Sequence, residues 1–69
     1  LAEKALLDLV YLTPGANTDS YLRELRLQHT ETLDADTLEK LADRMGKPKL
    51  RSAARLIRRL LVDEEMNSA

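Results

Sequence analysis

Histidine and cysteine, which often serve as bases, nucleophiles and metal ligands, are nearly missing from this sequence. His29 is the single histidine, and the chain has no cysteine. A serine nucleophile with a histidine base needs a third group to orient the ring, and His29 lies in a polar stretch between Gln28 and Thr30 that supplies none. We interpret His29 as a surface histidine. We expect no catalytic residue, no cofactor, no metal ion and no enzymatic activity in this chain.

A group of carboxylates in the middle of the chain is the nearest approach to a metal or acid/base site. It consists of Asp34, Asp36, Glu39 and Asp43. On the helix expected there, these residues occupy the first turn or the polar face, where acidic side chains complement the helix dipole. We favour this structural interpretation. Gly15 and Gly46 are isolated, so the chain has no glycine-rich phosphate loop.

Positive charge is concentrated near the end of the chain, where no acidic residue occurs between Asp43 and Asp63. At 100° per residue, four arginines of this stretch lie on one side of a helix and form what we call the arginine face: Arg51, Arg55, Arg58 and Arg59. Each pair of like charges at i, i+3 or i, i+4 spacing costs about 0.2–0.5 kcal/mol in an isolated helix. The clustering therefore suggests that another group interacts with this face.

Three interpretations of the arginine face remain open. Together with Lys49, its residues could contact nucleic-acid phosphates, or they could contact an acidic protein surface. Alternatively, the face is solvated and its arginines pair with acidic residues between Asp19 and Asp43. The net charge of -1 and the lack of interleaved aromatic or amide side chains make nucleic acid less favoured than a solvated face.

Length and composition indicate one small domain of ordinary globular character. The chain has 69 residues, of which 43% are hydrophobic and 33% are charged. The longest unbroken apolar run extends only from Leu9 to Leu12, which is too short for a membrane span or a signal-peptide core. We therefore expect a cytoplasmic protein that has no membrane partner.

The first two helices are indicated by apolar spacing and by turn residues. Residues 1–12 are apolar around most of a helical wheel, and Thr13-Pro14 ends that helix, because the residue before proline avoids the α region. Pro14-Gly15 suits a type II turn. Asn17 or Thr18 then caps a helix of roughly ten residues, whose apolar face is Tyr21, Leu22 and Leu25.

Two further helices follow, and residues at their starts indicate both, although Lys47 before the fourth helix is a poor cap. Asp34 is the expected cap of the third helix, which ends at Gly46, the usual residue for a left-handed C-terminal position. Pro48 is expected as the first residue of the fourth helix, whose acidic end from Asp63 onward should fray. No segment alternates with period two. The sequence thus predicts an all-α fold, a small bundle of four helices.

The first helix carries more apolar surface than three short helices can cover. Leu6, Leu9 and Val10 are expected to face the other helices, which leaves Leu7 and Tyr11 for an interface with protein outside this chain or with a second copy in a homo-oligomer. The helix also has no start signal before Leu1. We therefore interpret residues 1–69 as a single helical domain or fragment, the C-terminal part of a longer protein with a missing N-terminal domain.

The order of several short blocks is more specific than any one of them. The blocks are Glu3 to Leu12, Pro14-Gly15, Tyr21 to Leu27, Leu33-Asp34 with Leu38, Leu41 and Ala42, and Pro48 to Arg51. Together they resemble the end of the C-terminal domain of AbiEi-type antitoxins, and the resemblance covers nearly the whole chain. The block EKALLDLVYL is the most distinctive part of it.

This resemblance implies a bacterial regulator of a type IV toxin–antitoxin system. Such antitoxins resemble a winged-helix DNA-binding domain followed by a C-terminal domain. They oppose a nucleotidyltransferase toxin and repress their own operon. The winged helix would lie outside these residues, and DNA contact would come through the parent protein. A generic helical interaction or oligomerisation module of another regulator remains the alternative, and a small enzyme fragment is the least favoured class.

Overall fold

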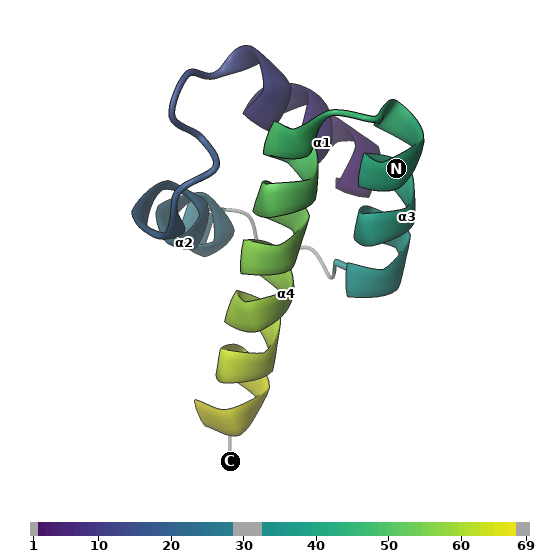
Figure 1. Ribbon diagram of the computed structural model, residues 1–69. Helices are drawn as coiled ribbons and strands as arrows, with labels where there is room; N and C mark the ends of the chain where they lie inside the picture. The colour runs from purple at the N-terminus through teal and green to yellow at the C-terminus, as the bar shows by residue number, and fades with distance from the viewer. Residues whose placement is uncertain (1, 29–32, 68–69) are drawn as a thin grey trace.

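The computed structural model describes residues 2–28 and 33–67, and this part of the chain is entirely helical apart from turns. It contains α1 (Ala2–Leu12), α2 (Asp19–Gln28), α3 (Ala35–Met45) and α4 (Pro48–Asn67). Figure 1 shows them gathered into one small bundle. The predicted all-α fold of four helices joined by short connections is confirmed.

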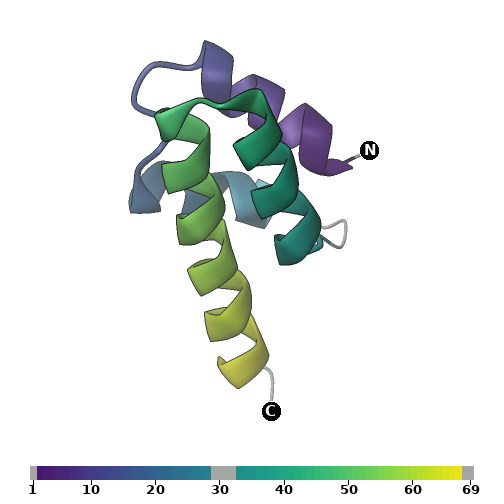
Figure 2. The ribbon, with the colours of Figure 1, turned by 45° about the vertical axis from the view of Figure 1, so that its right-hand side comes forward.

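The longest helix, α4, organises the bundle. It packs against each of the other three helices, whereas α2 packs against α4 alone among the helices. α3 and α4 lie side by side and run in opposite directions, joined by the turn at Gly46-Lys47 (Figures 1 and 2). The last turns of α4 extend past the rest of the bundle in both views.

The predicted helix boundaries are largely correct because they depend on local chemistry. Asp34 has extended backbone and its side chain accepts a hydrogen bond from the Asp36 N–H, so it caps α3. Gly46 is left-handed with φ 67°, and its N–H donates to the carbonyls of Ala42 and Asp43. At the start of α2, Thr18 is the cap, since its hydroxyl accepts from the Tyr21 N–H at 3.4 Å.

The end of α4 differs from the prediction. The helix continues to Asn67 instead of fraying from Asp63. Leu60 is buried, and Arg26 of α2 forms an ion pair with Glu64 at 3.3 Å, so the last turns are attached to a neighbouring helix. This tertiary contact compensates for acidic residues near the negative end of the helix dipole.

The core lies where α1, α3 and α2 meet α4. Its apolar members are Leu7, Val10, Ala16, Leu22, Leu38, Ala42, Leu50, Ala53, Ala54, Ile57 and Leu60. The assignment of Leu7 to an external interface is therefore wrong, because Leu7 is fully buried within the chain's own core. Leu9, which was expected inside, is 40% exposed.

The orientation of α1 has a polar cause. Glu3 is only 9% exposed, and its carboxylate accepts a hydrogen bond from the Asp34 N–H at 2.9 Å. Glu3, Leu7 and Val10 are spaced i, i+4 and i+7, so the contact at Glu3 turns the other two toward the core. Tyr11 and Leu12 then lie outside, 48% and 76% exposed. An interface at Tyr11 stays a prediction.

Candidate functional site

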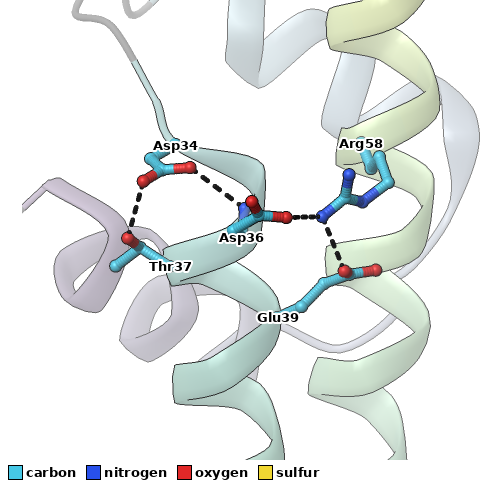
Figure 3. Close-up of polar contacts among 5 residues, drawn as sticks. All are labelled: Asp34, Asp36, Thr37, Glu39 and Arg58. Carbon is cyan, nitrogen blue, oxygen red and sulfur yellow. Dashed lines mark hydrogen bonds and ion pairs between the residues drawn. The ribbon is translucent and has the colours of Figure 1, made fainter.

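The grouped carboxylates of α3 interact with α4 and with the backbone of their own helix. Arg58 extends from α4 between Asp36 and Glu39 and donates to both carboxylates through the same nitrogen, with 2.8 Å to Glu39 (Figure 3). The hydrogen bond that Arg58 donates to Asp36, and next the one to Glu39, raises the pKa of the Arg58 guanidinium above its ordinary value. The cluster joins α3 to α4, which agrees with the structural interpretation made from the sequence.

The structure divides the arginine face into two parts. Arg58 binds Asp36 and Glu39, and Arg51 pairs with Asp43 at 3.3 Å. Arg55 and Arg59 are exposed and have no ion-pair partner in the part of the chain that the structure describes. Pairing with acidic residues therefore accounts for Arg51 and Arg58, whereas Arg55 and Arg59 remain available to another molecule.

Lys49 does not belong to this face. Its Nζ donates to the Thr13 carbonyl at 2.6 Å, and the side chain is half-buried. Thr13 directly follows the last residue of α1, so the ammonium group lies at the negative end of that helix dipole. Lys49 thus ties the start of α4 to the end of α1, and its contact with an external anion stays a prediction.

The bundle has a small hollow between α1, α2 and α4 that is partly open to solvent and has a cavity volume of only about 10 Å³. Its lining is apolar except for one arginine and consists of Leu6, Leu22, Leu25, Arg26, Leu33, Ile57 and Leu60. A lining without a carboxylate, histidine or hydroxyl offers no general acid, base or nucleophile. The hollow is therefore a packing feature rather than a reaction site.

Two contacts that shape this arrangement were not predicted from the sequence. They are the hydrogen bond from the Asp34 N–H to Glu3 and the one from Lys49 to Thr13. The sequence did indicate that such partners are needed, because the first N–H groups and the last carbonyls of any helix have no partner within that helix. This applies to the start of α3 and the end of α1. Their identity depends on how the helices dock.

Within residues 2–28 and 33–67, no group of three or more histidine, cysteine or carboxylate side chains could hold a metal ion. None of the helices in this part combines the length and apolar character needed to cross a membrane. His29 lies outside the described residues, so its predicted surface position is not addressed by the structure. No protein-family model, curated protein or solved structure matches the chain.

The cap of α3 predicts a defined pH dependence of stability. The Thr37 hydroxyl and the Asp36 N–H donate to the Asp34 carboxylate, which holds its pKa below the ordinary value of 3.8 (Figure 3). Because the pKa is lower in the folded chain, this contribution to stability is complete above pH 3.8. It is lost as the pH falls below that value through the pKa of the folded state.

Asp34→Asn tests this dependence, because asparagine still caps the helix but carries no titrating charge. Urea unfolding measured between about pH 6 and about pH 2 should show a constant stability difference at the upper end, which shrinks as Asp34 is protonated. A difference that does not change with pH would contradict the assignment.

Proposed function

We propose that this chain is a helical segment of a bacterial regulator that resembles AbiEi-type antitoxins. The protein would oppose a nucleotidyltransferase toxin in the cytoplasm and autoregulate its operon. The observation that carries the proposal is the order of the blocks that resemble this family. These blocks fall on structural units: Glu3 to Leu12 lies within α1, Pro14-Gly15 separates α1 from α2, and Pro48 begins α4.

In this proposal the chain acts by binding and positioning rather than by catalysis. Arg51 and Arg58 of α4 form ion pairs with carboxylates of α3 and are thus engaged within the bundle. α3 and α4 run antiparallel, whereas the helices of a DNA-reading helix-turn-helix cross at about 90–120°. We therefore assign operator recognition to the winged helix that such antitoxins carry elsewhere, and a scaffold role to this bundle.

The experiment that tests the proposal is relief of toxicity in cells. The protein that contains this chain is expressed together with the nucleotidyltransferase encoded beside it, and growth is followed. We expect the toxin alone to arrest growth and the protein to restore it, with His29→Ala as effective as the unchanged protein. A protein that leaves the arrest unchanged while folded would refute the antitoxin assignment, and a large loss of function in His29→Ala would refute the non-catalytic role.

A second candidate is a helical interaction module of a different regulator. It is favoured by three large apolar side chains of α1 that are exposed, namely Leu9, Tyr11 and Leu12. This candidate predicts no effect on toxin-arrested growth, so the growth assay separates it from the antitoxin.

A further inference from the structure

The outward side of α4 carries four exposed side chains in a heptad-like order. Arg55, Arg59, Val62 and Met66 follow one another at spacings of four, three and four residues, which places them along one stripe of the helix. Val62 and Met66 are large apolar side chains that are 47% and 74% exposed. We call these four residues the outer stripe.

The other sides of α4 are occupied by the chain itself. Arg51 and Arg58 bind carboxylates of α3, and Glu64 pairs with Arg26 of α2. The buried residues of α4 face inward and contact the core. The outer stripe is thus the side of α4 that no other described helix covers, and its second half lies on the turns that extend past the bundle (Figure 2).

Charge along α4 is distributed in a self-complementary way. Its basic first part has no acidic residue, and acidic residues begin only at Asp63. Two copies of the helix placed side by side in opposite directions would match the basic part of each with the acidic part of the other. Two parallel copies would instead bring arginine next to arginine, which is repulsive.

We propose that the outer stripe binds a second copy of this chain, with the two α4 helices antiparallel across a two-fold axis. Arg59 then lies opposite Val62 of the second copy and beside Asp63 of that copy, and Arg55 lies opposite Met66. The aliphatic stems of the arginines cover the apolar side chains while their guanidinium groups reach the carboxylates. Because the axis is two-fold, every contact occurs twice.

The dimer is held by few apolar groups and by charge. It therefore forms in a concentration-dependent equilibrium and weakens as salt screens the arginine–carboxylate contacts. Arg55 and Arg59, which do not pair with the α3 carboxylates, are the arginines that contact the second copy in this arrangement. The proposal does not depend on the antitoxin assignment, because it rests on the sequence and geometry of α4 alone.

Sedimentation equilibrium of the full 69-residue chain over a wide concentration range tests the proposal. We expect a monomer–dimer equilibrium that Arg59→Asp or Asp63→Arg weakens by about tenfold, since each change acts at two symmetric contacts. The double variant Arg59→Asp/Asp63→Arg should recover most of the association. Arg44→Asp makes the same charge change on an exposed side chain of α3 and should leave dimerisation unchanged.

Circular dichroism of every variant separates a loss of folding from a loss of pairing. Met66→Ser is a second variant, which changes an apolar side chain of the outer stripe and keeps all charges. A chain that stays monomeric at every concentration would overturn the proposal. So would association that the double variant fails to restore. Binding of a DNA duplex to the monomer that Arg55→Gln and Arg59→Gln weaken, without any dimer in sedimentation, would assign the stripe to nucleic acid instead.

Discussion

Replacing Leu7 with alanine is expected to lower the free energy of unfolding by about 2–5 kcal/mol, the range for removing a buried leucine side chain. Leu7 is fully buried and packs in the core at which α1 meets α3 and α4. Small domains hold only about 5–15 kcal/mol in total. The variant should therefore unfold at much lower urea concentration, or be partly unfolded without denaturant.

Leu12→Ala is the matched control, because it removes the same atoms from the same helix at a side chain that is 76% exposed. Its expected effect is within about 0.5 kcal/mol. Urea unfolding followed by circular dichroism measures both variants. Similar losses of stability in the two would contradict the orientation of α1 described above, and so would a larger loss in Leu12→Ala.

The contrast between these two leucines shows where sequence reasoning succeeds and where it fails. The ends of α1 and α3 were predicted correctly, because Pro14 and Gly46 act through the backbone of their own neighbourhood. The side of α1 that is buried was predicted wrongly. Apolar residues surround most of this helix, so periodicity alone does not select one face.

The arginine face also shows which features the sequence predicts and which depend on how the helices pack. The helical wheel placed four arginines on one side of the fourth helix, and pairing with acidic residues was one of the interpretations that the sequence left open. Which arginines pair depends on the docking of α3 beside α4, which brings Asp36 and Glu39 to Arg58. Arg55 and Arg59 remain exposed in the same helix. Only the packed structure separates these two groups.

The acidic end of α4 is another feature that depends on how the helices pack. The acidic residues from Asp63 onward oppose the helix dipole, and considered alone they predict fraying. The contact between Glu64 and Arg26 joins two helices that are far apart in sequence, and α4 continues to Asn67. Local propensity is a weak guide wherever a tertiary contact of this kind exists.

Removal of the Glu3 carboxylate is expected to produce the second large effect. Glu3→Ala leaves the Asp34 N–H without its partner, at a site where the glutamate is 9% exposed. An unsatisfied donor in such a place costs about 1–3 kcal/mol. Because this N–H belongs to the residue that caps α3, the loss should weaken both the start of α3 and the docking of α1 on it.

Glu3→Gln is the discriminating variant, since its amide oxygen can still accept the hydrogen bond although the charge is gone. It should lose clearly less stability than Glu3→Ala. Amide hydrogen exchange at Asp34 provides a local measurement, and exchange there should accelerate far more in Glu3→Ala than in Glu3→Gln. If the two variants were equally stable and exchanged at equal rates, the hydrogen bond would not be what orients α1. The burial of Leu7 would then have to arise from apolar packing alone.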